Sequence, residues 1–92
     1  MSSVRKLVLD VLKPHHPDAI HFAKAVAAVG AGYNVKLVVM EMDEKTETLR
    51  LEVSGTAIDF ELVQQALEEL GASLHSIDEV EVVNDEPPEQ QG

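Results

Sequence analysis

Asp10 stands in the middle of an apolar segment, an unusual place for a carboxylate. The alternation of that segment points the Asp10 side chain toward the sheet face opposite the helices. Sites for Ca²⁺ or Mg²⁺ need several converging oxygen ligands, and Glu79, His75 or Glu52 on neighbouring strands would complete the set. The sequence therefore allows a site for a divalent cation. The alternative is an ordinary strand carboxylate that is either solvated or paired with Lys6 or Arg50.

The histidines form a second group with possible chemistry. His15 and His16, with Asp18 and His75, would bind a transition metal or titrate near neutral pH. Adjacent histidines splay apart and seldom ligate one ion together, so capping of a loop is the competing interpretation. The sequence has no recognisable catalytic triad or phosphate-binding loop, and we expect a binding or assembly module. A small enzyme working through His15 and His75 is the alternative hypothesis.

These side chains lie on or beside four segments in which apolar and polar residues alternate. The patterns predict strands over residues 4–12, 33–42, 48–54 and 73–83. In the last segment Leu74, Val80 and Val82 favour one face and Ile77 the other. A β-bulge near Asp78 would reconcile the two phases.

Two helices are predicted between the strands. The first begins near Pro17, which suits a first helical turn, and ends at Gly30. The second is capped by Asp59, with Ile58 and Val63 forming a hydrophobic staple, and Gly71 terminates it. The chain is therefore an α+β protein with the order β-α-β-β-α-β.

Right-handed crossovers turn this order into a ferredoxin-like fold, with an antiparallel sheet in the order 4-1-3-2 and both helices on one face. The end of the first strand, the start of the last strand and the start of the first helix then lie at one edge of the sheet. We expect His15, His16, Ser73 and His75 to gather there, near helical N–H groups that favour an anion or a small ligand.

The sheet face without helices is predicted to be apolar and uncovered. Its residues are Val8, Leu12, Val38, Met40 and Ile77. A monomer rarely leaves such a patch in water, so we expect homo-oligomers assembled through this face or the edge strands. The alternative is shielding within the monomer by the long side chains of neighbouring basic residues, namely Lys6, Lys36 and Arg50.

Composition narrows the range of partners. The formal net charge is −10, with +3 on residues 1–40 and −13 on residues 41–92, and aromatic residues make up 3%. Acidic surfaces repel phosphate backbones, so nucleic acid is not an expected partner. The longest apolar run is too short for a membrane span, so no membrane association is expected. The lack of cysteine suits a reducing cytoplasm.

Four segments of the chain resemble an archaeal family known only as domain of unknown function 211. They are residues 7–15 (LVLDVLKPH), 41–47 (EMDEKTE), 58–60 (IDF) and 75–80 (HSIDEV), and the match runs from about residue 4 to 83. The resemblance implies a ferredoxin-like fold, ring-like homo-oligomers and binding of a divalent cation such as Ca²⁺, without an assigned activity.

Within those segments the resemblance singles out Asp10, His15, His75, Asp78 and Glu79. The acidic, proline-containing end and the alanine-rich first helix depart from the family pattern. We expect one domain over residues 1–83 and a disordered acidic tail over residues 84–92, because the tail has nothing to bury. A protein-docking adaptor that uses this tail is a further hypothesis.

Overall fold

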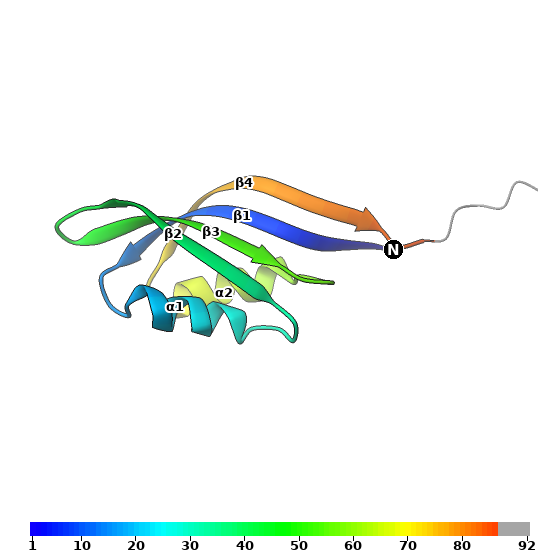
Figure 1. The fold of residues 1–92 in the computed structure, drawn as a ribbon, viewed down its shortest axis with the longest axis horizontal. Helices are drawn as coiled ribbons and strands as arrows, with labels where there is room; N and C mark the ends of the chain where they lie inside the picture. The colour runs from blue at the N-terminus through cyan, green and yellow to red at the C-terminus, as the bar shows by residue number, and fades with distance from the viewer. Residues whose placement is uncertain (87–92) are drawn as a thin grey trace, which may run out of the picture.

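The structure is a computed structural model that describes residues 1–86. Its elements are β1 (Ser2–Pro14), α1 (Ala19–Ala27), β2 (Asn34–Met42), β3 (Thr46–Ser54), α2 (Phe60–Glu69) and β4 (Ser73–Asn84). The four strands form an antiparallel sheet in the order β2-β3-β1-β4, and both helices cover one face of it (Figure 1). The predicted ferredoxin-like fold and strand order are confirmed. Neither helix has the length and apolarity to cross a bilayer within residues 1–86.

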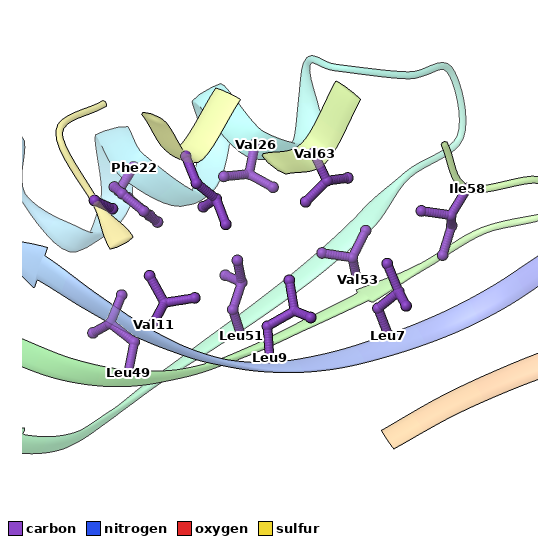
Figure 2. Close-up of a cluster of buried hydrophobic side chains, with 12 residues drawn as sticks. Leu7, Leu9, Val11, Phe22, Val26, Leu49, Leu51, Val53, Ile58 and Val63 are labelled. Carbon is purple, nitrogen blue, oxygen red and sulfur yellow. The ribbon is translucent and has the colours of Figure 1, made fainter. Parts of the chain in front are cut away.

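The core lies between the two central strands and the helices. Leu7, Leu9 and Val11 on β1 pair in register with Val53, Leu51 and Leu49 on β3, so every second residue of each strand faces the helix layer. Figure 2 shows this row packed under side chains of both helices, namely Phe22, Val26 and Val63. All of these side chains are almost completely buried.

Both helices begin at an aspartate cap. Asp18 accepts a hydrogen bond from the backbone N–H of His21, and Asp59 accepts one from that of Leu62. The predicted cap at Asp59 is confirmed, while α1 begins at Ala19, slightly after the expected start at Pro17. Gly71 follows α2 with φ of +77°, a left-handed conformation that favours glycine at a helix end.

The predicted bulge in β4 is present at Asp78, and a second irregularity lies at His75. The register passes from Val8–Glu79 to Leu9–Ile77, and from Asp10–Ser76 to Val11–Leu74. Each shift inserts one residue and so changes which side chains share a face. Ile77 is thereby paired with the core residue Leu9. The expectation that Ile77 belongs to the uncovered sheet face was wrong.

The expected apolar patch on the open sheet face is also wrong at Val8, which is only 6% exposed. Lys6 Nζ lies 3.1 Å from Glu79 and 3.8 Å from Glu52, and Lys36 Nζ lies 3.7 Å from Glu52. Glu52 and Glu79 are the cross-strand neighbours of Val8, so these ion-paired chains lie over it. Shielding within the monomer, the alternative interpretation, holds at this position.

The other residues expected in the apolar patch differ in their exposure. Leu12 is 41% exposed and Met40 is 58% exposed, whereas Val38 is half-buried. Met40 lies where the pairing of β2 with β3 shifts register, between Val39 and Glu41. Met40 therefore stands at a bulge on an edge strand, outside a continuous apolar face.

The C-terminal end of β4 is tied to the N-terminus. Asn84 pairs with Ser2, and the Asp85 N–H donates to the Met1 carbonyl over 2.7 Å. Asp85 also accepts hydrogen bonds from Ser3 and from Arg5. Residues 84–86 of the expected tail are therefore held by contacts with residues 1–5, including a hydrogen bond from the Met1 ammonium group to Glu86. The prediction of disorder for residues 87–92 lies outside the described residues.

Candidate polar site at the hairpin end of the sheet

Two charged side chains, Lys13 and Glu47, are buried in the helix-facing layer. They are direct cross-strand partners, at the ends of β1 and β3 next to the β2–β3 hairpin. Lys13 is 0% exposed and Glu47 is 7% exposed. A buried charge is costly unless it is paired and hydrogen-bonded, so the contacts of these two residues decide whether this end of the fold is stable.

Lys13 finds several acceptors. Its Nζ donates to the Pro14 carbonyl over 2.8 Å, and it lies 3.4 Å from both the His15 carbonyl and Glu47 Oε1. The ammonium group also lies 5.8 Å from the centre of the Phe22 ring on α1, within the range of a cation–π contact. Lys13 therefore joins β1, β3 and the first helix.

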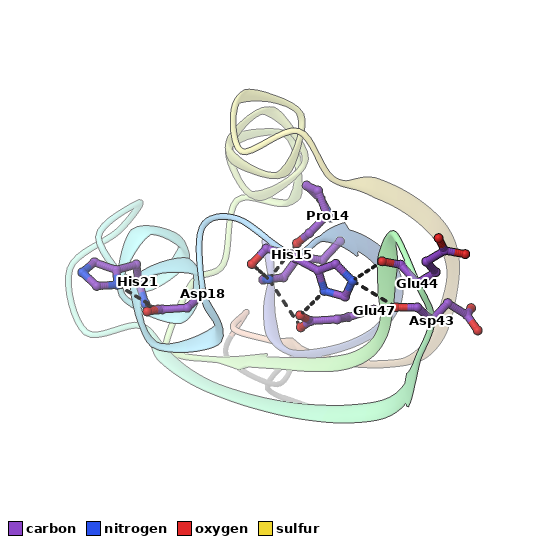
Figure 3. A network of polar contacts seen from close by, with 8 residues as sticks. Pro14, His15, Asp18, His21, Asp43, Glu44 and Glu47 are labelled. Atoms are coloured by element: carbon purple, nitrogen blue, oxygen red, sulfur yellow. Dashed lines mark hydrogen bonds and ion pairs between the residues drawn. The ribbon is translucent and has the colours of Figure 1, made fainter.

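His15 connects the same cluster to the hairpin. Its Nδ1 donates to Glu47 Oε2 over 2.9 Å, and its Nε2 donates to the carbonyls of Asp43 and Glu44, each over 3.0 Å (Figure 3). Carboxylates and carbonyls accept hydrogen bonds and do not donate them, so both ring nitrogens must carry protons to satisfy these contacts. The geometry selects the imidazolium form of His15.

The electrostatics follow this geometry. The hydrogen bond to Glu47 raises the pKa of His15 above its ordinary value, and the bond to the Glu44 carbonyl adds to this effect. The same hydrogen bond with His15 lowers the pKa of Glu47, against the opposing effect of burial, and the charge of Lys13 lowers it further. The cluster of Lys13, His15 and Glu47 thus carries two cations around one carboxylate, which we call the hairpin clamp.

The other residues expected at this edge do not join the hairpin clamp. His16 is exposed in the loop before Pro17, and Asp18 caps α1 and bonds the His21 ring over 2.8 Å. The start of α1 therefore already holds a carboxylate of its own, in the position where the sequence suggested an anion. Ser73 opens β4 opposite Leu12.

His75 lies on the other side of the sheet from the hairpin clamp. With Asp10, Leu12 and Thr48 it lines a hollow of about 240 Å³ on the open face. Asp10 stands opposite Arg50 on β3 and Ser76 on β4. The structure thus brings Asp10 and His75 together, as the cation hypothesis requires, but separates His75 from His15.

Asp78 and Glu79 are engaged elsewhere. Asp78 accepts a hydrogen bond from Ser76 Oγ over 2.7 Å, and Glu79 pairs with Lys6. Across residues 1–86 no three His, Asp or Glu side chains are grouped closely enough to hold a metal ion. Binding of a cation at Asp10, His75, Asp78 and Glu79 stays a prediction.

Comparison with known proteins gives the family. The family model described as uncharacterized ArCR, DUF211, matches residues 5–91 of the chain. The chain belongs to the archaeal DUF211 family. An uncharacterized protein of Methanocaldococcus jannaschii, MJ0319, is 38% identical over 80 residues, which cover 87% of this chain and 82% of that protein. The resemblance seen in the sequence segments is confirmed, and neither description assigns an activity.

In this DUF211 chain the sequence analysis missed Lys13 and Glu47. The predicted strands ended at Leu12 and began at Thr48, which left both residues outside them. Yet Lys13 continues the core-facing alternation of Leu9 and Val11, and Glu47 continues that of Leu49. Extending each period by one step would have placed opposite charges on one buried face.

Proposed function

We propose that this DUF211 protein is a homo-oligomeric assembly module whose copies pair through the two edges of the sheet. The observation that carries the proposal is that β2 and β4 are the edge strands and that both bear exposed apolar side chains. Edge strands present unpaired backbone groups that can add a strand from another chain. A second copy of this chain is therefore the expected partner.

The β4 edge offers the longer surface. Its exposed apolar residues are Ile77, Val80, Val82 and Val83. Val80 pairs with Leu7 and Val82 with Val4, both of which belong to the helix-facing side of β1 or pack on the core. Ile77, Val80 and Val82 therefore form an apolar stripe on the helix side of the sheet, next to the edge, whereas Val83 faces the other side. Covering it would stabilise an assembly by about 25 cal/mol for each Å² of apolar surface buried.

Charge favours pairing of β4 of one copy with β2 of the next over pairing of two β4 strands. β4 carries Asp78, Glu79 and Glu81 without a lysine or arginine, so two β4 strands side by side would place carboxylates next to one another. β2 carries one lysine, Lys36, and one glutamate, Glu41, so its charges balance, and it bears the exposed apolar residues Val39, Met40 and Met42. Pairing of β4 with the neutral strand β2 therefore places fewer carboxylates side by side than pairing of two β4 strands. Such a head-to-tail contact repeats from copy to copy and makes a ring when the rotation closes.

The expected interface changes accordingly. Met40 and Ile77, assigned from the sequence to an open-face interface, lie on the two edge strands, and Val8 is unavailable because it is buried. The proposal therefore assigns the contact to the edges. Leu12 and the hollow beside Asp10 stay on the open face, free to take a small ligand or cation.

The test is the mass of the protein in solution. We expect light scattering and native mass spectrometry to give an oligomer for the natural chain. The double substitution Val80→Asp and Val82→Asp should weaken association by roughly tenfold to a hundredfold, because charges replace about half-exposed apolar side chains at the edge. Spectra recorded with and without a chelator report any bound divalent cation at the same time.

Leu62→Asp is the matched control, because Leu62 is an exposed apolar residue on α2, away from both edges. It should leave the mass unchanged. A natural chain that stays monomeric at every concentration tested would refute the proposal, as would equal loss of assembly in the control.

A further inference from the structure

We propose that His15 is a proton-operated latch, which in its doubly protonated form fastens the tip of the β2–β3 hairpin to the end of β1 and releases it on losing one proton. The inference concerns one copy of the chain and does not depend on the proposed assembly. It rests on the placement of acceptors on both sides of one ring, described above for the hairpin clamp.

The two sides of the ring hold different segments. Glu47 and Lys13, on the Nδ1 side, are buried parts of the central strands. The carbonyls of Asp43 and Glu44, on the Nε2 side, belong to the exposed turn. A neutral imidazole has only one N–H, so it can donate to one side while its other nitrogen turns a lone pair toward an acceptor. Deprotonation therefore breaks the link between turn and core.

The charged groups around His15 favour the protonated ring. Glu47 contacts it directly, whereas the carboxylates of Asp43 and Glu44 point away from the ring (Figure 3). Asp18 is engaged with His21 at the start of α1. The remaining titratable groups on the neighbouring segments are Lys13, His16 and Lys45. Lys13 opposes the imidazolium by its charge, but the ammonium group is bound to Glu47 and to two carbonyls.

The direction of the pH dependence follows from linkage. Since the pKa of His15 is raised in the folded state, its stabilising effect is complete below the pKa of an unfolded histidine, about 6.5, and is lost as the pH rises through the higher folded value. Since the pKa of Glu47 is lowered, its contribution is lost only as the pH falls through a value below that of an ordinary glutamate. The latch is therefore closed at pH values between the lowered pKa of Glu47 and the raised pKa of His15.

NMR on the natural chain tests this directly. The His15 ring should titrate above about 6.5 with both nitrogens protonated at the lower pH. Over the same range the Asp43 amide, which donates to the Thr46 carbonyl over 2.8 Å, should lose protection from hydrogen exchange after correction for intrinsic rates. The loss should approach tenfold for each pH unit by which the His15 pKa exceeds that of an unfolded histidine.

Two variants complete the design. His15→Gln should remove the pH dependence of Asp43 protection, because glutamine does not titrate. His75→Gln, on the opposite face of the sheet, should retain it. If His15 titrates at an ordinary pKa, or if the protection of Asp43 does not follow its titration, the latch is refuted. The titration of the natural chain decides the matter even if His15→Gln fails to fold.

Discussion

Replacing Glu47 by alanine is expected to lower the free energy of unfolding by about 3–5 kcal/mol, because it leaves the Lys13 ammonium buried without its carboxylate partner. Lys13 is 0% exposed, so water cannot take the place of that carboxylate without opening the end of the sheet. His15 loses its Nδ1 acceptor in the same step. Small domains are stable by only about 5–15 kcal/mol, so urea denaturation should show a large fall in the midpoint.

Glu52→Ala is the matched control for this experiment. Glu52 lies on the same strand but on the open face, where it pairs with Lys6 and Lys36 at 3.8 and 3.7 Å. These pairs lie at the partly exposed surface with N–O separations of 3.7 Å or more, and surface pairs contribute about 0–1 kcal/mol, so removal of Glu52 should have a smaller effect than removal of Glu47. Equal losses of stability for the two substitutions would show that Lys13 does not depend on Glu47.

Replacing Phe22 by alanine is expected to lower the free energy of unfolding by about 3–5 kcal/mol, through loss of apolar burial and the cavity left behind. Phe22 is 0% exposed, and its ring is the part of α1 that faces Lys13 Nζ. The substitution therefore removes both a core side chain and the cation–π contact. Thermal unfolding followed by circular dichroism should show a clearly lower midpoint.

Ile20→Ala is the control on the same helix. Ile20 is 67% exposed, and alanine favours a helix at least as well as isoleucine, so the change should stay within about 0.5 kcal/mol. If Ile20→Ala proves as damaging as Phe22→Ala, the orientation of α1 on the sheet is wrong. Comparing the two substitutions therefore tests whether Phe22 on α1 covers Lys13 of the hairpin clamp.

The hairpin clamp gives a structural role to three charged residues that lie within two of the segments resembling the DUF211 family, residues 7–15 and 41–47. Every potential donor in it faces an acceptor, and Lys13 is enclosed by two strands and a helix. Such a cluster fixes the relative positions of β1, β3 and the hairpin turn. Breaking any of its contacts would leave a charged group without a partner. Its exposed partner is the turn of the β2–β3 hairpin, which continues into the β2 edge of the proposed assembly.

The order of strands and helices, their faces and several of their ends followed from the sequence. Alternation at Leu7, Leu9 and Val11 has the period of a strand with one buried face, and Asp59 and Gly71 have side chains and backbone freedom suited to the ends of a helix. The bulge at Asp78 could also be predicted, because a single strand cannot change phase without an inserted residue. These are local properties, and neighbouring residues determine them.

Only the tertiary structure decided which side chains meet across strands. Register brought Lys13 opposite Glu47, turned Ile77 to the core side, and covered Val8 with ion-paired chains from both neighbouring strands. A shift of one residue between strands exchanges the two faces, and no pattern within a single strand contains that information. The candidate site therefore depended on pairing between distant segments, while the fold depended mainly on periodicity within each one.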